Sequence, residues 1–323
     1  MYFIRHTNQL AQWYTESSKV PQSILDSTSV WTKTISTDLD ALSTMYLMDA
    51  RPKEKKCFMR QVTESYPVSF LKSNIQKCMR RNLLEACLST TQQLLRQDPT
   101  ECLRRLPVII AEDTGLHHES YDLLVWIMAA QSKGYQVTVE DEQLILGAVT
   151  TACSLPFRYH RHDKGQETTI PDKGFSMLLR SCYGGMKGDQ AFLRELAQRA
   201  DQLECGREWI SIPPFPVFTV DQMIPEAIDF HCSPSILSWC HEKTNLDIDH
   251  IRSAIWCHWS SPNVRVCRDT DCELLLYEED KQRRMTQRTF KRIESMVKIY
   301  AEKKRKWMVT EKKKVLVQTR IKF

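Results

Sequence analysis

The sequence of 323 residues contains no G-x-x-x-x-G-K-[ST] run, which excludes a Walker A loop for the phosphates of a nucleotide. It also contains no apolar run near the roughly 18 residues that cross a membrane, and its first ten residues include Arg5, His6 and Asn8. Only 9 residues are glycine, while apolar residues recur at helical spacings. We therefore expect a soluble, unsecreted, mainly helical protein without a membrane partner or ATPase activity.

Cysteine is plentiful but follows no repeating spacing. The 12 cysteines are scattered along the chain, and Cys78, Cys87 and Cys153 sit within apolar helical patterns. Such usage is typical of an intracellular, reducing compartment rather than of a disulfide framework.

Histidine and cysteine gather between residues 231 and 272, where the ligand types suit zinc. The residues concerned are His231, Cys232, Cys240, His241, Cys257, His258, Cys267 and Cys272. They form no C-x-x-C pair and no usual zinc-finger array, and Cys240 and Cys257 fall on or near apolar helical faces. Because free cysteine is commonly a buried hydrophobe, we expect no metal and no cofactor, with zinc as the alternative.

The net charge of +5 conceals a strong asymmetry. Residues 281–323 carry 16 basic and 3 acidic side chains, whereas residues 1–280 carry 29 basic and 37 acidic ones. A basic block of this kind favours nucleic acid, because neutralising phosphates releases counterions. The alternatives are a solvated helix and a nuclear-import signal at Lys303–Lys306, and the nucleus is the expected compartment.

The apolar patterns predict a mainly α protein in which a multi-helix bundle is joined to a second, smaller helical domain and a long basic helix. We expect an N-terminal segment at 1–60, the bundle at 61–206, the second helical domain at 207–275, and the basic helix and tail at 276–323. The charged run 51–56 and the proline-rich connector 212–216 mark two of these boundaries.

Local signals predict several helix limits. Asp98 is placed to cap a helix that begins at Pro99, Pro107 should kink or end that helix, and Asp189 should cap a later one. The apolar run 123–130 predicts a helix buried on all sides. A charged helix from about 278 to 308 has only a narrow apolar stripe, so it needs a partner surface or solvent.

No arrangement of residues predicts catalysis. Glu112–Asp113, Asp269 and Asp271 lack the pattern of a two-metal nuclease, and no cysteine or histidine lies in a catalytic signature. The glycine cluster at 183–188 could present Lys187 and backbone N–H groups to a phosphate. Turn chemistry favours a helix end followed by a tight turn at the same place.

The stretch from Leu71 to about Gln131 carries a resemblance to a known family. Its features are Gln76–Lys77 with Arg80, then Asp98–Pro99, Arg104–Arg105–Leu106 and Ile110–Ala111–Glu112–Asp113, followed by Gly115. In this order and spacing they resemble the helical region after the ATPase module in the replication-associated recombination protein A family, whose eukaryotic members are the Werner-helicase-interacting proteins. The resemblance covers about a fifth of the chain.

The resemblance implies a clamp-loader collar, an all-helical element that drives oligomerisation beside DNA-bound ATPase modules. With the basic block, it predicts a non-catalytic protein of DNA replication, recombination or repair, whose partners are single-stranded or branched DNA, replication or recombination proteins and a second copy of the chain. The candidate phosphate contacts are Lys77, Arg80, Arg81, Arg104, Arg105, Lys187, Arg283, Arg284, Arg288, Lys291, Arg292, Lys303, Lys304, Arg305 and Lys306. Tyr300 and Trp307 could add base stacking on a single strand.

Two further interpretations remain open. The end of the chain, residues 318–323, faintly resembles peptides that dock on sliding clamps, against the alternative of a frayed or strand-like tail. The whole chain could instead be a protein–protein scaffold whose basic helix binds an acidic partner. Binding to DNA should weaken steeply with salt, and an apolar helical interface should not.

Overall fold

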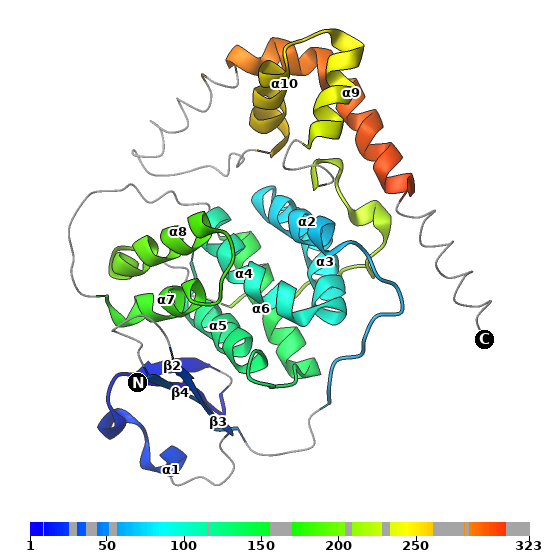
Figure 1. Cartoon of the computed structure of the whole chain (residues 1–323). Coiled ribbons are helices and arrows are strands. Elements are labelled where there is room, and N and C mark those ends of the chain that lie inside the picture. The colour runs from blue at the N-terminus through cyan, green and yellow to red at the C-terminus, as the bar shows by residue number, and fades with distance from the viewer. Residues whose placement is uncertain are drawn as a thin grey trace. The chain divides into compact units, whose positions relative to one another are not determined.

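The computed structural model describes residues 1–8, 10–25, 31–36, 44–51, 57–114, 116–155, 170–203, 209–227, 233–260, 281 and 284–307. The chain forms two compact units. The first unit comprises Met1–Thr63, Gln92–Pro156 and His162–Pro213, and the second comprises Glu64–Thr91, Phe157–Arg161 and Pro214–Phe323. Helices predominate (Figure 1), as the apolar spacing predicts.

The first unit holds most of the large helices. They are α4 (Pro99–Asp113), α5 (His118–Gln131), α6 (Val139–Ser154), α7 (Phe175–Ser181) and α8 (Lys187–Gln198), with the short α1 (Gln22–Leu25). The division between the units falls within α3 (Leu84–Gln97). Residues 123–130 in α5 are all buried, which confirms the prediction of a helix enclosed on every side.

Helix α4 begins as predicted but does not end where predicted. The Asp98 carboxylate accepts a hydrogen bond from the Glu101 amide at 3.0 Å, and Pro99 occupies the first turn. Of the two alternatives expected at Pro107, a kink or an end of the helix, the end is wrong, because α4 continues to Asp113. Proline removes one backbone hydrogen bond, and the buried side chains on both sides of Pro107, including Leu106 and Val108, hold the helix together through this point.

Asp189 also behaves differently from the prediction. Helix α8 begins at Lys187 after Met186, so Asp189 lies inside the first turn rather than at the cap. Its Oδ2 accepts a hydrogen bond from Arg105 Nη1 at 2.8 Å. The carboxylate is therefore used for an ion pair with α4 and is not an N-cap.

A four-stranded sheet forms from residues 1–50, which the sequence patterns left unassigned. Its strands are β1 (Tyr2–Arg5), β2 (Ala11–Tyr14), β3 (Trp31–Ser36) and β4 (Thr44–Asp49), in the order β2-β1-β4-β3. β1 pairs antiparallel with β2 and parallel with β4, and β3 pairs antiparallel with β4. The first strand of the chain is thus an inner strand of the sheet.

Aromatic side chains pack this sheet against α5 and α7. Phe3 stacks on Trp13 with ring centroids 4.0 Å apart. Trp13 Nε1 donates to Ser176 Oγ at 2.9 Å, and Trp126 Nε1 donates to the Phe3 carbonyl at 3.2 Å. Each buried indole N–H therefore has an acceptor, and these bonds fix the sheet in the first unit.

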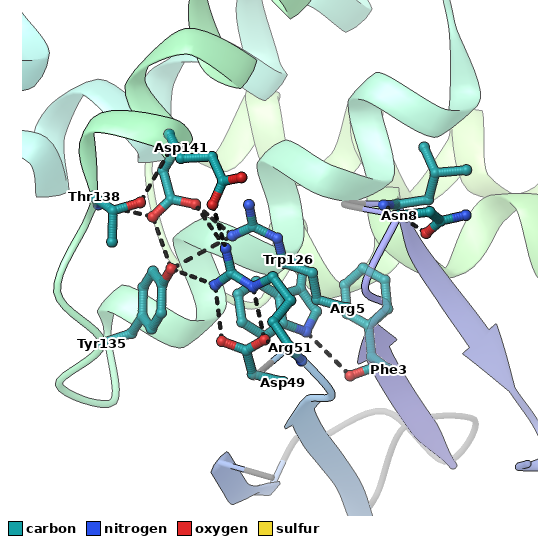
Figure 2. A network of polar contacts seen from close by, with 11 residues as sticks. Phe3, Arg5, Asn8, Asp49, Arg51, Trp126, Tyr135, Thr138 and Asp141 are labelled. Carbon is teal, nitrogen blue, oxygen red and sulfur yellow. Dashed lines mark hydrogen bonds and ion pairs between the residues drawn. The ribbon is translucent and has the colours of Figure 1, made fainter. Parts of the chain in front are cut away.

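A buried charge network joins β1 to the start of α6 (Figure 2). Arg5 forms an ion pair with Asp141, and both side chains are inaccessible to solvent. Asp141 Oδ2 also accepts from the Tyr135 hydroxyl at 2.7 Å and from the Thr138 amide at 2.8 Å, while the Asp141 amide donates to Thr138 Oγ1. Burial alone would raise the pKa of Asp141, but the Arg5 charge and these hydrogen bonds outweigh burial and lower it.

Arg51, just after β4, extends the same network. Its Nε and Nη2 donate to the two carboxylate oxygens of Asp49, each at 2.8 Å, and Nη2 donates to the Tyr135 hydroxyl at 2.6 Å. Such two-point pairing is among the stronger forms of ion pair. Because these cations and carboxylates pair with one another, the network has a structural role and connects the sheet to the helices.

The second unit contains α2 (Val68–Arg80), the first residues of α3, α9 (Pro234–Thr244), α10 (Ile248–Ile255), a π-turn (Trp256–Ser260) and a helix at 284–307. Residues 209–219 are neither helix nor strand, as predicted for the connector at 212–216. Within this unit, Asn74 Nδ2 donates to the Gln222 carbonyl at 3.0 Å, and Asn74 Oδ1 accepts from the Ile224 amide at 2.9 Å. This buried amide holds 222–224 against α2.

Candidate nucleic-acid interface

Three helices of the second unit share one apolar core. Helix 284–307, coloured orange to red in Figure 1, contributes Ile293, Val297 and Tyr300. The other core residues come from α9, α10 and the π-turn: Ile236, Leu237, Cys240, Ile251, Ala254, Ile255 and Trp259. The partner surface that the narrow apolar stripe requires is therefore supplied by α9 and α10.

Polar contacts fix how helix 284–307 is rotated about its axis. The Tyr300 and Ser235 hydroxyls lie 2.6 Å apart. The His258 ring stacks on Phe290 with centroids 4.7 Å apart, and its Nε2 lies 3.1 Å from Thr286 Oγ1. Contacts at both ends of the helix thus determine which side chains face outward.

The outward side of helix 284–307 is strongly basic. The helix carries nine basic and two acidic side chains. Arg284, Arg288 and Lys291 are exposed and follow one another at helical spacing, opposite the buried stripe. Two of the nine cations pair with glutamates of the same helix, Lys298 with Glu294 at 2.6 Å and Arg305 with Glu302.

The structure places most of the predicted C-terminal contacts at the surface. Arg284, Arg288, Lys291, Arg292, Lys303 and Lys306 are exposed, while Lys304 and Arg305 are half-buried. Arg283 and the tail at 308–323, with its proposed clamp-binding peptide, lie outside the described residues. Arg292 Nη2 donates to the Thr244 carbonyl at 3.3 Å, so this cation lies at the C-terminal end of α9.

The predicted contacts on α2 are less accessible. Lys77 is only 3% exposed, so this candidate phosphate contact is buried rather than at the surface. Helix α2 is enclosed more widely than its apolar stripe suggests, because Asn74 and Gln76 are buried as well. Arg81 Nη2 donates to the Trp259 carbonyl at 2.8 Å, and Arg80 is half-buried.

The remaining candidates, Arg104, Arg105 and Lys187, lie in the first unit. Arg105 pairs with Glu112 at 3.6 Å as well as with Asp189. Arg104 donates to the Tyr183 carbonyl, and Lys187 is exposed. These side chains belong to a different unit from the basic helix.

The glycine cluster adopts a tight turn. Gly184 and Gly185 have φ values of 74° and 113°, which favour glycine. Arg180 Nη1 donates to the Gly184 carbonyl at 2.9 Å, beside the contact of Arg104 with the Tyr183 carbonyl. Arginines that bind the carbonyls of this turn give it a structural role.

Among the described residues, no three histidine, cysteine, aspartate or glutamate side chains gather as metal ligands. Cys240 and Cys257 are buried, and burial raises the pKa of the Cys240 thiol to about 11. His231, Cys232, Cys267 and Cys272 lie outside the described residues. Separately, no helix in the described part of the chain is both long and apolar enough to cross a bilayer.

A pocket in the first unit offers little to an anionic ligand. It has a volume of about 370 Å³ and is lined by His6, Thr7, Pro21, Ser23, Ile24 and Ala50. Burial lowers the pKa of His6, so the ring is neutral near pH 7, and its Nε2 lies 3.1 Å from the Tyr14 hydroxyl. The basic helix is the better candidate for phosphate.

One cluster near the basic helix was missed by the sequence patterns. Lys303 Nζ lies 4.2 Å from the centre of the Trp239 ring, and Lys243 Nζ lies 5.7 Å from it. The spacing of Trp239 and Lys243, four residues apart on α9, is the only local signal. Lys303 is distant in sequence, so the three side chains come together only in the fold.

No family model, curated protein or solved structure matches this chain. The collar resemblance of residues 71–131 therefore stays a prediction from the sequence, and the geometry of the described residues carries the functional argument.

Proposed function

We propose that this chain is a non-catalytic, DNA-associated protein of replication, recombination or repair that binds nucleic acid electrostatically through helix 284–307. One observation carries the proposal: the apolar stripe of this helix is buried against α9 and α10, which leaves a fixed basic face in solvent. The proposed partners are DNA and, through the helical bundle, replication or recombination proteins or a second copy of the chain.

The charges of the helix suit phosphate contacts. Because the backbone of a folded helix is already ordered, its cations bind with a smaller loss of backbone freedom than cations on an unfolded tail. Affinity for duplex DNA falls as the salt concentration rises, and each phosphate that these cations neutralise makes the slope of log affinity against log salt concentration more negative by about 0.9. Contacts to phosphate carry no base sequence, so we expect binding with little sequence preference.

A side chain on which an unpaired base can stack favours a single-stranded ligand. Of the two aromatic residues predicted for this role, only Trp307 is available. Trp307 is 56% exposed at the end of the basic helix, beside Lys306. Tyr300 is buried and its hydroxyl contacts Ser235, so the expected stacking role of Tyr300 is wrong. An exposed indole flanked by cations is a suitable platform for an unpaired base.

The test is a binding titration with fluorescent single-stranded, duplex and forked DNA across a salt series. The variant R284Q/R288Q/K291Q removes three exposed cations of the outer face. We expect its salt slope to fall by roughly 2 to 3 and its affinity at 0.1 M salt to fall by roughly two powers of ten. The control K19Q/K133Q/K173Q removes three exposed lysines of the first unit.

The control should bind like the unmodified chain. Equal losses in both variants would show that net charge, rather than this helix, governs binding. Absence of binding to all three DNA forms at low salt would refute the proposal.

A second candidate, a protein scaffold, is favoured by apolar side chains on the same helix. Met285 and Ile299 are 76% and 50% exposed. An acidic amphipathic partner helix would cover these residues and pair with the cations around them. Binding to such a partner that persists at 0.5 M salt, without DNA binding, would favour the scaffold.

A further inference from the structure

Trp239 on α9 has two lysines against its ring. Lys303 Nζ lies 4.2 Å and Lys243 Nζ lies 5.7 Å from the ring centre, both within the range of a cation–π contact. The distance between the two ammonium nitrogens therefore cannot exceed the sum of these two distances. Both lysines are exposed, so a ligand can approach them from solvent.

The two ammonium groups are not compensated by carboxylates. Neither lysine forms an ion pair within the part of the chain that the structure describes, whereas Lys298 on the same helix pairs with Glu294. Arg292, whose Nη2 reaches the Thr244 carbonyl one residue after Lys243, adds a third cation nearby. Like charges this close repel, and a bound anion would relieve the repulsion.

The indole nitrogen of Trp239 has no acceptor among the described residues. Its Nε1 is buried and makes no hydrogen bond to this part of the chain, while the indole nitrogens of Trp13 and Trp126 both donate to oxygen. A buried N–H without an acceptor is unfavourable. Lys303 Nζ lies over the ring face rather than on this N–H, so an anion bound by the two lysines would lie beside an indole whose N–H is unsatisfied.

We propose that Trp239, Lys243 and Lys303 form a seat for one phosphate group of a nucleic-acid backbone. The phosphate oxygens contact the two ammonium groups, and the bound phosphate lies beside the Trp239 ring, so that it changes the environment of the indole N–H. The inference rests on the proposed function, because the seat lies beside the basic face of helix 284–307 and positions a strand along it.

The test uses the full chain labelled with ¹⁵N at the indole nitrogens, with a W239F variant to assign the Trp239 signal. Titration with a short single-stranded oligonucleotide should shift this signal. Loss of one phosphate contact lowers the salt slope by about 0.7 on single strands, which corresponds to about fivefold weaker binding at 0.1 M salt. We expect this loss for K243Q and for K303Q.

The matched control is K298Q, which removes an exposed lysine of the same helix that is already paired with Glu294. It should lower affinity less than twofold. If DNA binds but K243Q and K303Q match K298Q, or if the Trp239 signal stays fixed, the seat is wrong and the proposed function stands.

Absence of DNA binding by the unmodified chain overturns both proposals. A parallel titration with inorganic phosphate distinguishes the source of the anion. If millimolar phosphate moves the Trp239 signal and DNA does not, the cluster is a site for small anions and the assignment to a nucleic-acid backbone is overturned.

Discussion

Replacing Asp141 with asparagine tests whether the buried charge network holds the first unit together. The variant keeps the size of the side chain and an oxygen for the Thr138 amide, but it removes the charge that compensates Arg5. Arg5 is fully buried, and Arg51 is already paired with Asp49. Breaking one partner of a buried ion pair typically costs about 3–5 kcal/mol, and we expect D141N to lie in this range.

Two further variants separate the ion pair from its parts. R5M retains the apolar stem of the side chain, and Asp141 keeps its hydrogen bonds from Tyr135 and Thr138. We therefore expect R5M to cost less than D141N. The double variant R5M/D141N should be destabilised by less than the sum of the singles, because either single change already removes the Arg5–Asp141 pair, while Arg51 Nη1 still lies 3.7 Å from Asp141 in R5M.

The assay is amide hydrogen exchange of α5 and α6 under native conditions, supported by urea unfolding at pH 7. Exchange localises the effect to the first unit without assuming that the two units unfold together. K19Q is the control, since the pair of Lys19 with Glu16 is exposed and solvent screening leaves it little effect on stability. Additive single variants, or a D141N cost below 1 kcal/mol, would refute the reasoning.

The same network predicts a pH dependence. The pKa of Asp141 is lower in the folded protein than its ordinary value of 3.8. Its stabilising contribution is therefore complete at pH well above 3.8 and is lost as the pH falls toward the folded pKa. The difference in stability between the unmodified chain and D141N should shrink in that acidic range.

Three other residues give independent tests. Burial raises the pKa of Asp122 to about 7, and its Oδ1 has no partner in the described structure. The unmodified chain therefore loses stability as the pH rises from about 4 to about 7. In thermal melts, D122N should be more stable than the unmodified chain by the order of a few kcal/mol at pH 8 and nearly equal to it at pH 4. I293A should cost about 2–5 kcal/mol and speed hydrogen exchange in α9 and helix 284–307, since Ile293 is fully buried between them. D98A should cost roughly 1 kcal/mol in urea unfolding through the lost cap of α4, and no change would contradict that role.

The helices were the predictable part of the fold. The cap at Asp98, the enclosed helix at 123–130 and the apolar stripe of Ile293 and Val297 are local signals, each complete within a few turns. A proline weakens a helix locally, which is why an end of the helix was one expectation at Pro107. The helix continues because the neighbours of Pro107 are buried, and that burial depends on the rest of the unit.

The sheet was not predictable in the same way. Its strands are four to six residues long, too short for a clear two-residue period. The parallel pairing of β1 with β4 joins Phe3 to Leu47, and no local pattern reports such a partner.

The candidate interface was predictable in its charge and not in its geometry. The count of basic residues located the C-terminal helix, and the exposed Arg288 and Lys291 agree with that placement. The sequence did not indicate that Lys77 is buried, nor that Lys303 meets Trp239 across two helices. Those facts depend on which helices pack together.

The inner position of β1 has a consequence for the order in which this chain folds. β1 is synthesised before its parallel partner β4, which ends at Asp49, and the carboxylate that neutralises Arg5 follows 136 residues later on α6. Contacts between such distant residues form slowly, because a long loop must close first. Until α6 is synthesised, Arg5 keeps its hydration shell, and the nascent sheet lacks the contacts that bury it. The first unit therefore cannot complete its folding before Asp141 is synthesised, and a chain truncated before Asp141 should not form the native first unit.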